Sequence, residues 1–360
     1  MRLETVQEIL GHDGEFLTVD AEVGRTGEDG ARQIESRWTT LRHQLEEAGV
    51  GAGLLEEIGS RLTEPTHLPG EQRRTIVAVG DRVALDDVHA LHASWPETVD
   101  VGVLPDLRGW LRAEDAALPF LLVRIDRVGA DLEMYAAASR PPTAERSVHG
   151  LDYYITKVQP GDWAQKQFQQ TAENRWQHNA EEVAEAARSM ARRHRPLVML
   201  VCGDVRARAD LVNAWSERDT PVVALKSGGR ASGVSDDAMW SEVESALAAV
   251  EAERDRVLVD RLAEGVSNGV AVSGLAPVLD ALVQQRVDTL LVDLAGLEDM
   301  TVRPQEHPGL VLPPRALEAD ELPADRALVA GAALSGAQVA LLPAEMMPAG
   351  PVAALLRWSD

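Results

Sequence analysis

The chain has 360 residues, of which 35 are basic and 58 are acidic, so its net charge is −23. This length favours two or three domains over a single core. The acidity excludes a protein whose whole surface is drawn onto nucleic acid by electrostatic attraction. Cys202 is the single cysteine, which excludes a disulfide framework and a thiolate metal cluster within one chain.

Membrane and metal signals are weak throughout the sequence. No apolar run approaches the roughly 20 residues needed to span a bilayer, and the N-terminus lacks an apolar run of signal-peptide length. None of the histidines of the first segment forms a metal-like pair with a nearby acid on a shared helix face, so they are interpreted as solvated or capping side chains. We therefore expect a cytoplasmic protein that holds no metal ion and needs no cofactor.

The first segment, residues 1–118, is predicted to be an α/β domain. Ile34, Trp38, Leu41 and Leu45 recur at helical spacing and give one helix a single apolar face. Short β-type runs alternate with turn residues around it. The expected helices are 31–47 and 51–62, and the expected strands are 15–20, 74–79, 83–85 and 99–104.

The middle segment, residues 119–247, opens with a hairpin signal. The apolar run 119–125 is followed by a turn at 127–131 and a second run at 132–137. The continuous apolar run 196–202 is typical of a strand buried on both faces. Further strands are expected at 152–156 and 221–225, and a helix at 208–215.

The stretch from Lys157 to Arg195 has the pattern of a loop on a helical stalk. A Pro-Gly turn carrying Trp163 leads into one long helix, which Pro196 ends. This arrangement would carry a tip into a partner's cleft, although an ordinary surface helix after an ordinary turn has the same pattern. The apolar stripe of the helix consists of Phe168, Ala172, Trp176, Val183, Ala187 and Met190.

The last segment, residues 248–360, alternates helices and strands and is predicted to be an α/β/α sandwich. A helix over 239–263 enters it, and a Pro-rich irregular connection is expected over 304–323. The other expected helices are 275–285 and 327–335, and the expected strands are 271–274, 287–292, 338–342 and 352–357.

Charge is unevenly distributed over the three segments, with net values of −12, −2 and −9. Only the middle segment escapes the acidity, so any contact with RNA phosphate is expected there. The cations at the end of the helix have an alternative role, because they also complement a helix dipole. The predicted RNA-binding residues are Lys157, Lys166, Arg175, Arg188, Arg192, Arg193 and Arg195.

Two runs of residues resemble the archaeo-eukaryotic release-factor superfamily, which includes the eukaryotic class-1 release factor and Pelota, and especially its actinobacterial branch. In that family a Gly-Gly-Gln loop precedes a long helix with Arg-Phe and Arg-His-Asn steps, and a C-terminal helix leads into a Val-x-Thr-Leu-Leu strand. The matching residues here are Gln167-Phe168, Gln177-His178-Asn179 and Val183-Ala184-Glu185, followed by 272–282 and 286–292. The resemblance implies three domains, with a release-factor-like middle domain made of a mixed sheet and a long helix.

The tip departs from the family pattern. Alignment on Phe168 places Gly161, Asp162 and Trp163 where Gly-Gly-Gln would stand, so the glutamine that coordinates the hydrolytic water is missing. Gln165 lies two residues later, which is several ångströms along a loop, whereas the chemistry needs hydrogen-bond reach of about 3 Å. Asp162 would also oppose stabilisation of the developing oxyanion.

The resemblance therefore favours a non-catalytic translation factor that binds the ribosomal A site, similar to Pelota-like rescue proteins and Balon-type ribosome hibernation factors. Its implied partner is the ribosome, through rRNA, with tRNA and a translational GTPase left open and with neither DNA nor a membrane expected. The alternative is a peptidyl-tRNA hydrolase, as in ribosome quality control, with Gln165 as the catalytic residue. A third hypothesis is a small-molecule enzyme that cradles a phosphate at Lys226–Arg230, although that loop lacks P-loop spacing and has the composition of a plain flexible loop.

Overall fold

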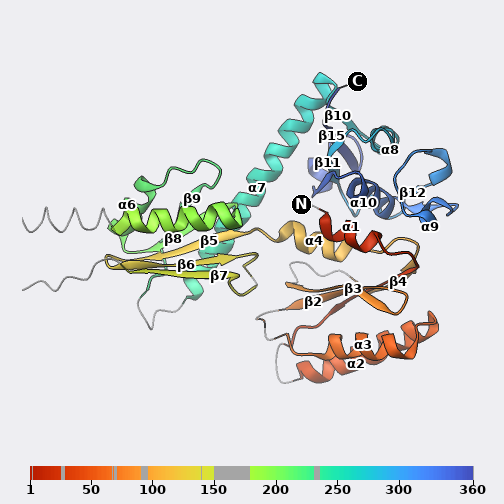
Figure 1. The fold of residues 1–360 in the computed structure, drawn as a ribbon, viewed down its shortest axis with the longest axis horizontal. Helices are drawn as coiled ribbons and strands as arrows, with labels where there is room; N and C mark the ends of the chain where they lie inside the picture. Colours follow the sequence, from red (N-terminus) through yellow and green to blue (C-terminus); the bar gives the residue numbers. More distant parts are fainter. Residues whose placement is uncertain are drawn as a thin grey trace, which may run out of the picture. The chain divides into compact units, whose positions relative to one another are not determined.

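The computed structural model describes residues 1, 3–25, 29–66, 68, 71–90, 96–138, 140–149, 179–230 and 236–359. Its contacts divide the chain into two compact units, as the ribbon in Figure 1 shows. Unit 1 combines Met1–Ala116 with Arg254–Asp360, and unit 2 is Ala117–Glu253. The three-domain division at residues 118 and 247 stays a prediction.

The first half of unit 1 is a four-stranded antiparallel sheet with the order β3-β2-β1-β4. Two helices pack on one face, because apolar residues alternate along the strands and recur on the helices. Leu17 and Val19 on that face contact Leu45 and Ile58. The elements are α1 (Glu4–Leu10), β1 (Phe16–Glu22), α2 (Gly30–Glu47), α3 (Ala52–Thr63), β2 (Gln72–Val79), β3 (Arg82–Ala90), β4 (Thr98–Gly102) and α4 (Arg108–Ala116).

The predicted strands and helices of this segment are all present, and β3 is longer than expected. The helices α1 and α4 were not predicted from the sequence. Both are short, and their buried faces, such as Val6 and Ile9 on α1 and Trp110 on α4, contact the second half of unit 1 in one shared core. Their partners are far away in sequence, so local periodicity alone did not reveal them.

The second half of unit 1 is the predicted α/β/α sandwich. Its sheet has the order β10-β15-β11-β14, in which only the β11–β14 pair is parallel. Leu290 and Val292 face α8 and α10, whereas Leu291 faces Leu262 on α7. The elements are α7 (Asp237–Asn268), β10 (Ala271–Ser273), α8 (Leu275–Val283), β11 (Val287–Val292), β12 (Thr301–Val302), η1 (Pro304–Glu306), α9 (Pro314–Leu317), β13 (Leu322–Pro323), α10 (Ala324–Leu334), β14 (Gln338–Leu341), η2 (Ala344–Met346) and β15 (Val352–Leu356).

The connection 304–323, predicted to be irregular, contains short regular pieces. It holds η1, the single turn α9 and the strand β13, which pairs with β12. Elements of two to four residues give no periodic signal in a sequence, so the composition indicated only a loop.

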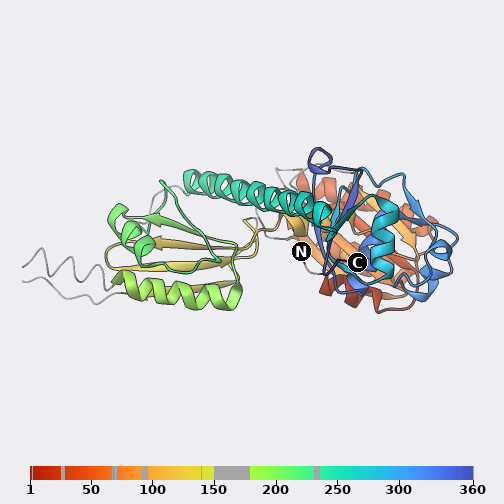
Figure 2. The same cartoon turned by 90° about the horizontal axis from the view of Figure 1, so that it is seen from above.

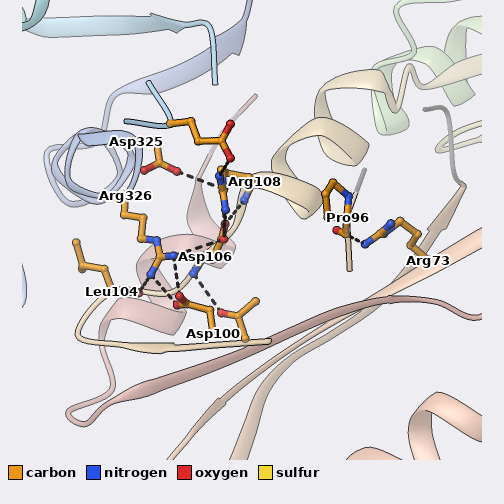
Figure 3. A network of polar contacts seen from close by, with 10 residues as sticks. Arg73, Pro96, Asp100, Leu104, Asp106, Arg108, Asp325 and Arg326 are labelled. Carbon is orange, nitrogen blue, oxygen red and sulfur yellow. Dashed lines mark hydrogen bonds and ion pairs between the residues drawn. The ribbon is translucent and has the colours of Figure 1, made fainter. Parts of the chain in front are cut away.

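A network of charged side chains joins the two halves of unit 1 (Figure 3). Arg326 on α10 donates to both carboxylate oxygens of Asp100 on β4, at 2.6 and 2.9 Å. Asp106, which is almost fully buried, accepts from Arg108 at 2.7 Å and lies 3.5 Å from Arg326. Arg108 in turn lies 3.7 Å from Asp325. The neighbouring residues Asp325 and Arg326 of α10 therefore each form an ion pair with the first half of unit 1.

These surroundings move two carboxyl pKa values in opposite directions. Burial raises the pKa of Asp325, and the negative charge of Asp106 adds to this effect. Burial by itself would also raise the pKa of Asp106, but hydrogen bonds from Arg108 and the charge of Arg326 outweigh this effect, so the pKa of Asp106 is lowered. Asp106 is therefore the carboxylate that anchors the network.

Unit 2 is built on a five-stranded mixed sheet with the order β7-β6-β5-β8-β9. The strands β5, β8 and β9 are parallel, whereas β6 and β7 run antiparallel to β5 in the predicted hairpin and its extension. The elements are β5 (Phe120–Ile125), β6 (Gly129–Tyr135), β7 (Ala144–His149), a helix over residues 179–194, β8 (Val198–Gly203), α6 (Val205–Ala214), β9 (Val222–Ala224) and the first part of α7.

Helices cover both faces of this sheet, as Figure 2 shows from above. The helix 179–194 and α6 pack on the face that carries Leu121 and Val123. Met239 and Val243 of α7 pack on the opposite face against Phe120. This architecture agrees with the predicted middle domain of a mixed sheet plus a long helix. The predicted strand 152–156 lies outside the described residues, and β7 was not predicted because its Glu-Arg-Ser core has no apolar alternation.

Candidate nucleic-acid interface

The helix 179–194 has the buried stripe that its sequence predicts. Val183, Ala187 and Met190 are buried against the sheet. The helix ends where Arg195 adopts a left-handed φ of 51° and donates its N–H to the Ala191 carbonyl at 2.7 Å, just before Pro196. The other predicted stripe residues, Phe168, Ala172 and Trp176, lie outside the described residues.

The four cations at the end of this helix have different environments. Arg188 is only 20% exposed, and it donates to Glu185 at 3.0 Å and to the Ala214 carbonyl at 3.1 Å. Arg192 is 61% exposed, and it lies 3.3 Å from Glu185 and 3.9 Å from Glu217. Arg188 therefore links the helix to the end of α6, whereas Arg192 forms only exposed ion pairs.

Arg193 and Arg195 differ from these two. Both side chains are exposed, and no carboxylate among the described residues forms an ion pair with either. They lie at the C-terminal end of the helix, where a cation also complements the helix dipole. They are therefore the described members of the predicted RNA-binding set that best suit an external phosphate.

A groove of about 470 Å³ lies between β7 and the helix. Its lining includes Arg146 but also the carboxylates of Glu182 and Glu185. Two carboxylates oppose a phosphate backbone, so this groove is a poor surface for RNA. The cationic end of the helix is the better candidate.

The remaining predicted site residues fall outside the described residues. They are the loop-tip residues Gly161, Asp162 and Trp163, the candidate catalytic residue Gln165, and the cations Lys157, Lys166 and Arg175.

Both flanks of the segment 150–178 attach to the turn that joins β5 and β6. His149, at the end of β7, pairs with Gly129. Asn179 donates its side-chain amide to the Arg127 carbonyl at 3.2 Å. A side chain at Gly129 would bring its Cβ to 2.0 Å from the Val148 carbonyl oxygen, so glycine is required for this close strand pairing.

The turn is also linked to the neighbouring parallel strand. Arg127 lies 3.3 Å from Asp204, which follows β8. Asp204 caps α6 by accepting the N–H groups of Arg206 and Ala207 at 3.0 and 3.1 Å, and these bonds lower its pKa. Polar contacts thus link the β5–β6 turn to the end of β8 and to both flanks of the segment 150–178, which contains the predicted tip and is called the tip segment below.

The loop Lys226–Arg230, considered above as a phosphate cradle, is occupied by carboxylates of unit 2. Glu242 accepts the Lys226 N–H at 2.5 Å and the Ser227 hydroxyl at 2.7 Å, and these bonds lower its pKa. A Cβ at Gly228 would lie 2.8 Å from the Met239 sulfur, so close packing accounts for this glycine. The loop therefore has a structural explanation that needs no phosphate.

Other chemistry has little support among the described residues. Cys202 is fully buried, and burial raises the pKa of its thiol to about 11, so it is a core thiol and not an activated nucleophile. Within the described ranges, no three His, Cys, Asp or Glu side chains are grouped as a metal site would need. None of the helices that the structure describes is long and apolar enough to cross a membrane.

The comparison with protein families places this fold in a class. Residues 119–268 match the model of bacterial archaeo-eukaryotic release factor family 2. Residues 119–268 are therefore similar to bacterial archaeo-eukaryotic release factors, which confirms for this region the resemblance inferred from the sequence.

Similar proteins extend beyond the matched region. Two proteins of Mycobacterium tuberculosis, named as uncharacterized proteins Rv2629 and MT2704, are each 25% identical over 305 residues, covering 82% of this chain and 79% of theirs.

Among solved structures, Pelota of Archaeoglobus fulgidus aligns with a TM-score of 0.33 and 18% identity, covering 80% of each chain. The S. cerevisiae protein Dom34, described as a translation termination-like factor that interacts with Hbs1, aligns with a TM-score of 0.42 and 10% identity over 81% of this chain and 80% of its own. Ribosome-bound archaeal Pelota aligns with a TM-score of 0.40 and 14% identity over 99% and 94%. All three TM-scores are below 0.5, so the class assignment rests on the family model.

Proposed function

We propose that this protein is a cytoplasmic translation factor of the hibernation or rescue type, which binds the ribosomal A site without a Gly-Gly-Gln hydrolytic loop. The observation that carries the proposal is the family match over 119–268, the part of the chain that holds the sheet, the helix and the tip segment. In this proposal the tip segment points toward the peptidyl-transferase centre, and Trp163 stacks on an unpaired base.

The sequence supports the non-catalytic form of this proposal. Gly-Gly-Gln occurs nowhere in the 360 residues, and the only consecutive glycines, Gly228 and Gly229, precede an arginine. At the aligned tip, Asp162 would bring a negative charge toward tRNA phosphates and toward the oxyanion of ester hydrolysis. Binding without turnover is the function that these residues suit best.

The positions of the cations support rRNA as the partner. Arg193 and Arg195 extend from the helix end into solvent on the least acidic segment of a strongly acidic chain. Contacts of this kind release counterions from RNA, so they give binding a steep salt dependence. A translational GTPase is proposed as a further partner, as the resemblance of the sequence to the release-factor superfamily implies.

The proposal is tested by co-sedimentation with ribosomes over a range of salt concentrations. The double substitution Arg193→Gln and Arg195→Gln is expected to weaken binding and to flatten the slope of log K against log salt by about 1 per phosphate contact. The matched control replaces the exposed Arg32 and Arg42 of unit 1 by glutamine and should leave the slope unchanged. Failure of the parent protein to pellet with ribosomes at low salt would contradict the proposal.

A peptidyl-tRNA hydrolase is the second candidate, because Gln165 stands only two residues beyond the aligned tip. Turnover of labelled peptidyl-tRNA on stalled ribosomes separates the two functions. If the protein is a hydrolase, Gln165→Ala should reduce release by about 10²-fold or more, whereas Gln170→Ala should not. Binding without release, unaffected by either substitution, is the result expected for the non-catalytic factor.

A further inference from the structure

The turn between β5 and β6, residues 126–129, is a shared anchor for the segment 150–178. One flank of the segment attaches through the pairing of His149 with Gly129, and the other attaches through the bond from Asn179 to the Arg127 carbonyl at 3.2 Å. A displacement of this turn therefore moves both flanks together. The turn itself is closed by Asp126, whose carboxylate accepts the N–H groups of Val128 and Gly129 at 2.8 and 2.9 Å.

One side chain from a distant part of the sequence holds this turn. Arg230 donates through Nη1 to both oxygens of Asp126 at 3.1 Å and through Nε to Asp131 at 2.8 Å. Its side chain is only 16% exposed. Asp131 also accepts from the Ser147 hydroxyl at 2.9 Å, so the network reaches β7 two residues before its end. Arg230 thus connects the turn, β6 and β7.

The chemistry of this contact specifies an arginine. Two carboxylates that face the same point repel each other unless a cation lies between them. A guanidinium group presents several N–H donors in a rigid plane and can serve both carboxylates at once, whereas an ammonium group is a single point charge. Although partial burial acts to raise the pKa of Asp131, the bonds from Arg230 and Ser147 lower it, consistent with a charged carboxylate in this network.

We propose that Arg230 is a positioning residue, which fixes the 126–129 turn and thereby holds His149 and Asn179, the two residues that flank the segment 150–178. The loop Lys226–Arg230 then has the role of holding the turn from which the tip segment is supported, and it is not a phosphate-binding site. The inference rests on the proposed function, because position matters only if the segment reaches a ribosomal target.

The test compares Arg230→Ala and Arg230→Lys with a control that loses stability elsewhere. Val243→Ala serves as this control, because Val243 is fully buried on the opposite face of the sheet. Each protein carries Ala164→Cys, to which an iron chelate is attached. Cys202 is buried and its pKa is raised to about 11, so the introduced cysteine is the one that reacts. The cleavage pattern on rRNA then reports where the tip lies.

Arg230→Ala is expected to weaken ribosome binding about tenfold and to shift or broaden the cleavage pattern, since a loosely held support misplaces what it carries. Arg230→Lys should restore affinity to within about threefold of the parent, because the charge is kept and only one carboxylate loses its bond. Val243→Ala should lower the urea midpoint of unfolding and leave the cleavage pattern unchanged.

The inference is overturned if Arg230→Ala binds and cleaves like the parent, or if Val243→Ala alters the pattern to the same extent. Either result would show that Arg230 contributes at most to stability. Failure of the parent to bind ribosomes at all is a different result, because it contradicts the proposed function before the role of Arg230 arises.

Discussion

Replacement of Arg326 by methionine tests the charged network that joins the two halves of unit 1. The substitution keeps much of the side-chain length but removes the guanidinium group, which leaves Asp100 and Asp106 without this partner. Loss of one partner of a buried ion pair costs about 3–5 kcal/mol. Arg326 is 14% and Asp100 is 26% exposed, and water can hydrate the remaining carboxylate in part. We therefore expect a loss of about 2–4 kcal/mol.

For a unit of this size, each kcal/mol lowers Tm by about 2–4 °C, so the Tm of Arg326→Met should fall by about 4–16 °C in differential scanning calorimetry. A double-mutant cycle with Asp100→Asn should show a coupling free energy of about 1 kcal/mol or more. The control is Arg303→Met, which removes exposed surface pairs with Glu306 and Glu321 and should cost less than about 1 kcal/mol. A Tm within about 1 °C of the parent for Arg326→Met would refute the reasoning.

Three further predictions concern stability. Arg357 donates to the Gln285, Ser335 and Gly336 carbonyls at the ends of α8 and α10. Arg357→Ala should therefore lower the free energy of unfolding in urea by about 1–3 kcal/mol. An unchanged urea midpoint would contradict this capping role. Burial acts to raise the pKa of Asp86, but bonds from Arg74 and Arg61 outweigh it and lower the pKa below its unfolded value. The contribution of Asp86 to the free energy of unfolding is therefore fully present above about pH 4 and is lost as the pH falls through the folded pKa. In urea unfolding measured at a series of pH values, Asp86→Asn should make the free energy of unfolding fall less steeply at acidic pH. Gly203 has a φ of 118°, and an added Cβ would lie 1.9 Å from the Ile125 carbonyl oxygen. Gly203→Ala should therefore lower the free energy of unfolding of unit 2 by more than about 1–3 kcal/mol. An unfolding curve like that of the parent would contradict this packing.

Sequence patterns predicted the elements whose partners are local or whose periodicity is strong. The hairpin of β5 and β6, the continuous apolar strand β8 and the longer elements of the sandwich, such as β11 and α10, follow from runs of at least five or six residues. The apolar stripe of the helix 179–194 was also predicted, and its buried residues Val183, Ala187 and Met190 confirm that part.

The missed elements lack such a signal. The edge strand β7 is largely exposed, so no apolar alternation marks it. The helices α1 and α4 are stabilised by contacts with residues roughly 170 to 320 positions away, such as Val287 and Ala327, and a local window cannot contain such contacts.

The charged residues of the candidate interface show the same limit. The sequence grouped Arg188 with Arg193 because they lie close together on one helix, yet only the fold shows that Arg188 bonds to the Ala214 carbonyl. Arg230 drew attention as part of a glycine-rich loop, but its partners Asp126 and Asp131 lie about a hundred positions earlier. Composition can locate a cationic region, whereas tertiary contacts decide which cations are committed within the protein.

The central claim is tested most directly by a cryo-EM map of ribosomes incubated with the full chain. We expect density for residues 119–268 in the A site, with the segment 150–178 directed toward the peptidyl-transferase centre. The end of the helix 179–194, with Arg193 and Arg195, should lie against rRNA. Ribosomes with an empty A site at saturating protein and low salt, or with the chain bound only at another surface, would contradict it.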